Sequence, residues 1–239
     1  MRFVLVHGGW QGGWCWDAVA ARLRAEGHEV FAPTLRGLAE GEVDRAGVDL
    51  TAAGEGLVAA IEERDLTDLV LVGHSGGGPV IQYAADRLAD RTRRVVFVSA
   101  WVLHDGEAIH DVLPRPLVEG DRAAAAQRPD RTILMDPGVW KAHFMNGATD
   151  EQVAAVADRL VPQPLGWLTE PISLPRFWTA EPPSSYVFLR DDRGVPMELY
   201  REMAGRLTNP RVVECDGPHE AMLTHPEALA DALVTAAHD

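Results

Sequence analysis

The feature that most constrains the fold is the stretch of residues 68–86, DLVLVGHSGGGPVIQYAAD, in which an aliphatic run stops at a serine among glycines. Residues 69–72 are uninterrupted aliphatic residues, typical of a strand that is covered on both faces. The pentapeptide GHSGG, centred on Ser75, follows as a G-x-S-x-G match, and Pro79 stands near the first turn of a helix-periodic segment. The order strand, tight turn, helix predicts that Ser75 lies in a strained turn with an exposed hydroxyl group.

The glycines around Ser75 have a physical reason in that context. A Cβ beside the serine would collide with the neighbouring strand and helix. The helix N-terminus offers free N–H groups and a positive dipole end, which suit a developing oxyanion. A G-x-S-x-G match alone occurs by chance, but between a buried strand and a helix it favours a nucleophilic serine over an ordinary glycine turn.

Predicted strands and helices alternate along most of the chain. Helical spacing of apolar residues predicts helices between the strands and after Pro196 and Pro226, and the strands are predicted at residues 3–6, 30–32, 69–72, 95–98, 186–189 and 212–213. This alternation predicts a doubly wound, mostly parallel α/β sheet of about six strands. Residues 101–183, rich in Pro, Trp and short amphipathic pieces, break the pattern. We therefore expect a single domain over residues 1–239, with a helical cap at residues 101–183 inserted after the fourth strand.

The charge balance limits the class of partner. The chain of 239 residues has a formal net charge of -14 and a sequence pI near 5.0. Nucleic acids and anionic membranes select basic surfaces, so neither partner is expected. No apolar stretch reaches membrane-spanning length and no signal-peptide pattern opens the sequence, which predicts a cytoplasmic protein. Cys15 and Cys215 form no C-x-x-C motif and are expected to be buried, reduced thiols; the oligomeric state is not readable from the sequence.

A nucleophilic serine needs a base and an acid, because its hydroxyl group is a poor nucleophile at neutral pH. In this strand–turn–helix context the chain order is serine, then an acid, then histidine, on loops that follow later strands. The sequence RDDRGVP follows the strand predicted at 186–189, and DGPHE follows the strand predicted at 212–213. His219 is therefore the predicted base, and the acid is Asp191 or Asp192.

The remaining histidines lack that position at the working edge of the sheet. His7 and His74 border the two motifs and are expected to shape turns, since a lone histidine there is more often a packing or hydrogen-bonding residue than a catalyst. No pair of histidines joins a third ligand at a spacing typical of metal sites, so no metal is predicted.

The turn after the first strand, HGG at residues 7–9, can supply an oxyanion hole. It is similar to the start of an HGGG-type loop, whose backbone N–H works together with that of the residue after the nucleophile. We expect the amides of Gly9 and Gly76 to form the hole, because glycine allows close approach to a substrate oxygen.

Together these motifs resemble the α/β-hydrolase branch that contains plant methylesterases, hydroxynitrile lyases and related bacterial esterases. The resemblance spans nearly the whole chain and is weakest in the cap; it is carried by FVLVHGG from residue 3, GWCW from 13, GHSGG from 73, DRGVP from 192 and HEAML from 219. It implies a six-stranded core, a helical cap and a buried pocket between them. In that family an acid followed by x-Gly-Ile/Val-Pro is the triad aspartate, which selects Asp192 and leaves Asp191 as its exposed neighbour.

Two positions separate esterase from lyase chemistry within that family. One group of lyases has a threonine directly after the first-strand histidine and a lysine directly after the catalytic histidine. Here those positions hold Gly8 and Glu220, and Lys141 is the only lysine in the chain. A carboxylate beside the base opposes an anionic leaving group, so esterase chemistry is expected. Gln11 replaces a histidine common in plant members, which leaves the substrate preference open.

The predicted function is a serine hydrolase that cleaves a small to medium hydrophobic carboxylic ester, such as a methyl ester or lactone. The reaction runs through an acyl-enzyme on Ser75 and needs no cofactor. The pocket is expected to be apolar and lined by aromatic side chains, with Trp10, Trp101, Trp140, Phe144 and Trp167 as candidates. A lyase or other cofactor-free reaction with the same triad, and a non-catalytic ligand receptor, are the alternatives, because fold and triad do not specify the reaction.

Overall fold

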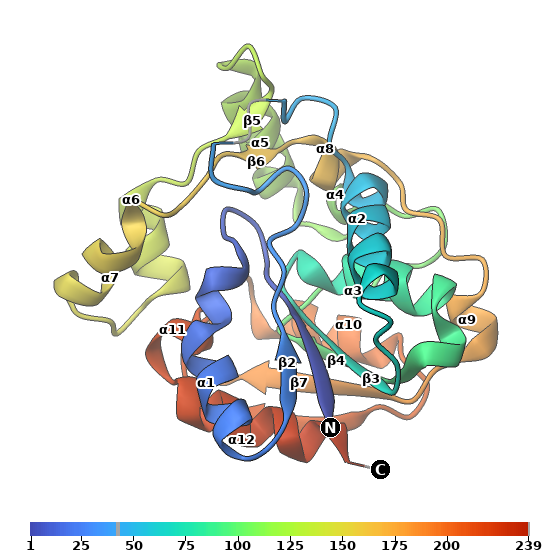
Figure 1. The fold of residues 1–239 in the computed structure, drawn as a ribbon. Coiled ribbons are helices and arrows are strands. Elements are labelled where there is room, and N and C mark those ends of the chain that lie inside the picture. Colours follow the sequence, from blue (N-terminus) through green and yellow to red (C-terminus); the bar gives the residue numbers. More distant parts are fainter. Residues whose placement is uncertain (42–43, 239) are drawn as a thin grey trace.

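A six-stranded parallel sheet forms the centre of the protein (Figure 1). In the computed structural model, which describes residues 1–41 and 44–238, the strand order is β2-β1-β3-β4-β7-β8. The strands are β1 (Arg2–Val6), β2 (Glu29–Phe31), β3 (Leu69–His74), β4 (Thr92–Val98), β7 (Ser184–Leu189) and β8 (Arg211–Cys215). Each strand lies within about three residues of a predicted apolar run, and the predicted doubly wound α/β fold is confirmed.

Helices cover both faces of the sheet. They are η1 (Gly13–Trp16), α1 (Asp17–Ala25), α2 (Leu50–Glu63), α3 (Gly77–Arg87), η2 (Ala89–Arg91), α10 (Met197–Gly205), α11 (Ala221–Thr224) and α12 (Pro226–Ala237). In Figure 1, α1, α11 and α12 lie on one side of the sheet, and α2 and α3 lie on the other.

Side chains of the central strands alternate between two buried clusters. Val4 and Leu71 pack with residues of α2, α3 and α10, whereas Leu5 and Val70 pack with residues of α1, α11 and α12. Because both faces of these central strands are covered, they must be apolar at successive positions rather than at every second one. This burial explains why the strands read as continuous aliphatic runs.

The register of the sheet brings four loops to one edge. Val6 of β1 is opposite Gly73 of β3, so the HGG turn and the serine turn leave the sheet side by side. Leu189 of β7 is opposite Cys215 of β8, so the segments that carry the two aspartates and His219 also leave together. Parallel pairing therefore gathers residues separated by more than a hundred positions at the carboxyl ends of the strands.

The segment between β4 and β7 lies over that edge and is not purely helical. Its elements are α4 (Ile109–Val112), α5 (Arg115–Ala126), β5 (Thr132–Ile133), α6 (Pro137–Val139), η3 (Trp140–Phe144), α7 (Asp150–Ala157), β6 (Gln163–Pro164), α8 (Gly166–Thr169) and α9 (Phe177–Ala180). Strands β5 and β6 pair antiparallel in a second, two-stranded sheet, which the expected helical cap did not include.

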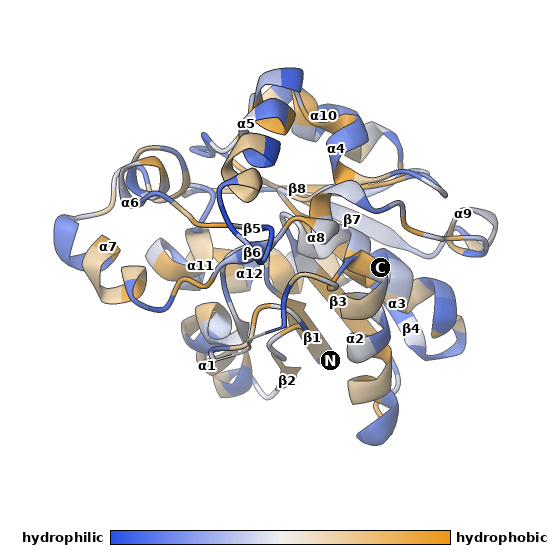
Figure 2. Cartoon of the chain, turned by 90° about the horizontal axis from the view of Figure 1, so that it is seen from above, coloured by the Kyte–Doolittle hydropathy of each residue, from blue (hydrophilic) through white to orange (hydrophobic). Residues whose placement is uncertain are grey.

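The cap differs from the core in how much of it is buried. Seen from above, α5 and α7 mix hydrophilic and hydrophobic residues (Figure 2), and of α5 only Ala125 is buried. The first residues of the predicted insertion, Trp101 and Val102, instead pack in the core cluster with α3 and α10. The segment therefore begins as part of the core and separates from it only later.

Two further expectations concern the whole chain. Across the described ranges, none of the helices is long and apolar enough to cross a membrane. Cys15 and Cys215 are both buried free thiols, and burial raises the pKa of each. The cytoplasmic location stays a prediction.

Candidate active site

Ser75 lies in the sharp turn between β3 and α3. Its φ of +51° is in the left-handed region, which costs a non-glycine residue on the order of 1–3 kcal/mol. Backbone hydrogen bonds of Ser75 hold the turn in place. Its N–H donates to the Val98 carbonyl (3.2 Å), and its carbonyl accepts from the N–H groups of Gly78 (3.1 Å) and Trp101 (3.2 Å). A Cβ on Gly77 would lie 2.6 Å from the His7 carbonyl oxygen, so glycine is required where α3 approaches the first turn.

His219 and Asp192 meet at the same edge. Nδ1 of His219 lies 2.7 Å from Oδ2 of Asp192, and both side chains are buried. The other carboxylate oxygen of Asp192 accepts from Gly194 N–H (2.8 Å), and the Tyr200 hydroxyl lies 3.2 Å from the same imidazole nitrogen. Two loops and helix α10 therefore fix the orientation of the ring.

Asp191, the other aspartate that the chain order allowed, faces away from the imidazole. It is exposed, and its carboxylate accepts from Gly217 N–H (3.2 Å). Its own N–H donates to the Gly217 carbonyl (3.0 Å), which ties Asp191 to the segment that precedes His219. Asp192 N–H donates to the Leu189 carbonyl (3.2 Å), so residues 189–192 form a tight turn in which Asp192, and not Asp191, hydrogen-bonds His219.

The charge state of His219 follows from its neighbours. Burial by itself lowers the pKa of this imidazole, but the charge and hydrogen bond of Asp192, together with the charge of Glu220, outweigh it and raise the pKa overall. His7 has no such partner, and burial lowers its pKa to about 4. His7 also has a structural task, because its Nε2 accepts from Leu35 N–H (3.0 Å) and its Nδ1 donates to the Gly8 carbonyl (2.8 Å).

The HGG turn lies directly beside Ser75. A Cβ on Gly8 would lie 2.9 Å from Ser75 Cβ, and a Cβ on Gly76 would lie 3.8 Å from the Gly9 nitrogen. Gly9 and Gly76, the two predicted oxyanion-hole residues, both line the cavity that Ser75 and His219 also line.

Gln163 is a site residue that sequence reasoning did not find. Its side chain is buried, lines the cavity, and accepts a hydrogen bond from the N–H of Trp10 (3.2 Å). A Cβ on Gly9 would lie 2.9 Å from the same oxygen. Gln163 holds the first turn from the cap side, across a separation of 153 residues for which the sequence carries no local signal.

A cavity of about 400 Å³ opens between the cap and Ser75. Four predicted aromatic residues line it: Trp10, Trp101, Phe144 and Trp167. The ring of Phe144 meets the His219 ring edge-on at 5.0 Å between centroids. Eight aliphatic side chains also line the cavity: Ile109, Leu113, Leu117, Ile133, Leu134, Val139, Leu168 and Val195. Those of the cap other than Leu168 were missed because short cap elements show no clear periodicity.

The prediction that Trp140 lines the pocket is corrected by its position. Trp140 is fully buried and stacks on Phe144 with 5.3 Å between ring centroids, so that Phe144 stands between it and His219. Its indole N–H donates to the Met145 sulfur (3.0 Å). The residue packs the interior of the cap with Met145 and Val153 instead of contacting the cavity.

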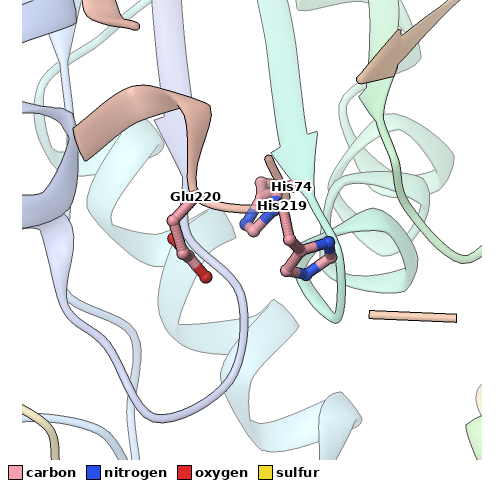
Figure 3. A group of neighbouring side chains, drawn as sticks. All are labelled: His74, His219 and Glu220. Carbon is pink, nitrogen blue, oxygen red and sulfur yellow. The ribbon is translucent and has the colours of Figure 1, made fainter. Parts of the chain in front are cut away.

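A cluster of buried polar residues lies beside His219, and the sequence pattern did not predict that these residues are neighbours. His74, Glu220 and Gln11 are at most 2% exposed. The rings of His74 and His219 are 4.4 Å apart between centroids, and potential ligand atoms of His74, His219 and Glu220 lie within 4.8 Å of one another (Figure 3). Burial and the neighbouring His219 hold the pKa of His74 well below its ordinary value. The expectation of a site without metal stays a prediction.

Replacing Glu220 with glutamine is expected to stabilise the folded chain at neutral and alkaline pH. Burial raises the pKa of Glu220 to about 7, against an ordinary value of 4.5. Below the ordinary value both the folded and unfolded states keep the proton; between the two values only the unfolded state releases it. The wild-type chain therefore loses up to about 3 kcal/mol over that window, a loss the glutamine variant avoids.

Unfolding free energies of the two chains from about pH 4 to about pH 8 test this linkage. The advantage of the glutamine variant should grow with pH and level off above neutrality. A stability difference that is the same at every pH would contradict the assignment of a raised pKa to Glu220.

Comparison with known proteins agrees with this architecture. The model of the alpha/beta hydrolase family matches residues 3–232. The carbendazim hydrolyzing esterase of Nocardioides sp. (strain SG-4G) is 32% identical over 241 residues, which cover 97% of this chain and 98% of the relative. Putative methylesterase 14, chloroplastic, of Arabidopsis thaliana is 26% identical, and the match covers 98% of this chain and 71% of that protein.

A solved structure is similar over its full length. It is an extracellular alpha/beta-hydrolase from a Paenibacillus species, described as sharing structural and functional homology with the tobacco salicylic acid binding protein 2. The two chains are 30% identical, the match covers 100% of each, and the TM-score is 0.94. The chain therefore belongs to the α/β hydrolase family, in the branch that contains plant methylesterases and related bacterial esterases.

Proposed function

We propose that this esterase-type α/β hydrolase cleaves small to medium apolar carboxylic esters through an acyl-enzyme on Ser75. The observation that carries the proposal is the convergence, around one cavity of about 400 Å³, of a serine at positive φ, a buried His219–Asp192 pair, and the Gly9 and Gly76 turns. Each of these parts has a role in acyl transfer, and they come from four loops at one edge of the sheet.

In the first half of the reaction, His219 removes the proton of the Ser75 hydroxyl as its oxygen attacks the ester carbonyl. The new C–O bond places negative charge on the carbonyl oxygen, which the N–H groups of Gly9 and Gly76 hold. Asp192 keeps the imidazole in the tautomer with its proton on Nδ1 and stabilises the imidazolium. His219 then gives its proton to the departing alcohol, and the acyl group remains on Ser75.

In the second half, water takes the place of the alcohol. His219 removes a proton from this water, the hydroxide oxygen attacks the acyl carbon, and the same amides hold the second oxyanion. Collapse of this intermediate breaks the bond to Ser75, which regains its proton from His219, and releases the carboxylic acid. None of these steps requires a cofactor.

The substrate class is supported by the surroundings of the cavity. Its walls are mainly aliphatic and aromatic, which suits an apolar acyl or alcohol group positioned by few polar contacts. Two carboxylates, Asp121 and Asp136, are the acidic residues around it, and no lysine or arginine of the described chain lines it. An uncharged ester is therefore favoured over an ester that also carries a free carboxylate group. The relatives named as esterases support an ester substrate of this kind.

Labelling with a fluorophosphonate tests the nucleophile without knowledge of the natural substrate. Intact mass should show one adduct on the wild-type chain and none on Ser75→Ala or His219→Ala. A panel of methyl esters, aryl esters and lactones then tests turnover, with a cyanohydrin to detect lyase activity. A folded wild-type chain that takes no label and turns over no ester would overturn the proposal in favour of a ligand receptor.

A further inference from the structure

Glu220 is a buried carboxyl group that the proposed reaction does not use. Its backbone is fixed from two sides: its N–H donates to the Phe144 carbonyl of the cap (3.0 Å), and its carbonyl accepts from Leu223 (3.0 Å) and Thr224 (3.2 Å) at helix α11. The residue is 2% exposed, and Oε2 of its carboxyl group has no hydrogen-bond partner among the described residues. The carboxyl group is therefore held in place rather than free to turn toward solvent.

The surroundings of this carboxyl group are dominated by the two histidines. One of its oxygens lies within 4.8 Å of a ring nitrogen of both His74 and His219 (Figure 3). The uncharged amide of Gln11 favours the ionised form of Glu220. Three other titratable groups interact with Glu220: Asp192 after β7, Tyr200 of α10 and Cys15 of η1. Asp17 and Arg159 act in turn on the Cys15 thiol.

Among these neighbours, His219 is the one group that changes charge during the reaction. His74 stays neutral, because burial and His219 hold its pKa well below the ordinary value. Burial also raises the pKa of the Tyr200 hydroxyl and the Cys15 thiol well above their ordinary values, so both stay protonated. The favourable partner for an ionised Glu220 is therefore the imidazolium form of His219.

We propose that Glu220 is a second acidic positioning residue for His219, so that two buried carboxylates rather than one stabilise the protonated imidazole. The inference rests on the proposed function, in which His219 is protonated while Ser75 attacks the substrate. Glu220 acts through His219 and has no place among the residues that line the substrate cavity.

The coupling has a definite sign. An ionised Glu220 raises the pKa of His219, and a protonated His219 lowers the pKa of Glu220. Because each group shifts the pKa of the other, the two titrate as a coupled pair. Losing the carboxyl group leaves the imidazolium with Asp192 alone. The pKa of His219 must then fall, and its protonated form becomes less accessible in the transition state.

The Glu220→Gln variant tests this. The acid limb of kcat/KM against pH should move down by roughly one pH unit, because an opposite charge within this distance is lost. The plateau kcat should fall severalfold. Glu220→Asp, which restores the charge, should return the limb toward its wild-type position. Glu227→Gln, on the exposed surface of α12, is the matched control and should leave the profile unchanged.

A second readout separates this inference from the proposed function. NMR titration of the His219 ring, assigned with His219→Gln, reports the imidazole pKa without any substrate. A lower midpoint in Glu220→Gln, with no change in Glu227→Gln, supports the coupling even if no ester is hydrolysed, in which case only the proposed function fails. Ester turnover with both the kcat/KM limb and the NMR midpoint unmoved would overturn the role of Glu220. If the glutamine variant does not fold, Gln11→Leu should move both readouts in the same direction by a smaller amount.

Discussion

Asp192→Asn is expected to lower kcat on a hydrolysed ester by roughly 10⁴-fold, the loss typical of replacing the acid of a serine–histidine–acid triad. The side-chain oxygen of Asp192 accepts the Nδ1 proton of His219 at 2.7 Å. An amide nitrogen at this position favours the opposite tautomer, with the proton on the nitrogen that must remove the Ser75 proton. The measurement is kcat and KM on an ester from the panel, and KM should change little because the cavity walls are intact.

Asp191→Asn is the matched control for that prediction. Asp191 is adjacent in sequence and exposed, and its carboxylate contacts only the Gly217 N–H among the described residues. Its replacement should leave kcat within about twofold of wild type, since exposed substitutions of this kind have small effects. Equal losses in both variants, or a larger loss in Asp191→Asn, would show that the acid has been assigned to the wrong residue.

Gly78→Ala is expected to reduce the free energy of unfolding by about 3 kcal/mol or more, in the range of overpacked cores. Gly78 lies in the first turn of α3, where a Cβ would be 2.2 Å from the Trp101 carbonyl oxygen and 3.0 Å from the Cβ of Ala100. The first of these neighbours is backbone, so no change of rotamer can relieve the contact. Helix α3 would have to separate from the segment after β4.

Urea unfolding of Gly78→Ala and Gly120→Ala measures this effect against a control. Gly120 is also within a helix, α5, but a Cβ there meets no atom within 4 Å. Its replacement should stabilise the chain by about 0.5–1 kcal/mol through lower chain entropy. A Gly78→Ala chain that unfolds within 1 kcal/mol of wild type would contradict the close contact between α3 and Trp101.

The core strands and the serine turn could be predicted because their causes are local. Residues 69–72 are aliphatic at every position since both faces of β3 are covered. The turn at Ser75 needs glycines on both sides, and these glycines lie within two residues of Ser75 in the sequence. The cap has no comparable local signal: β5 and β6 have two residues each, and Gln163 reaches Trp10 only because the cap folds over the first turn.

Sequence by itself determined the α/β class, the strand–turn–helix that presents Ser75, and the two short segments from which an acid and a base could come. Tertiary structure alone decided which residues act on one another. The tight turn of residues 189–192 places the Asp192 carboxylate against His219. The stacking of Phe144 over Trp140 removes that tryptophan from the cavity. Burial behind His219 changes Glu220 from an ordinary charged residue into a carboxyl group with a pKa of about 7. Backbone preferences depend on neighbours in the chain, whereas burial, charge coupling and side-chain direction depend on neighbours in space.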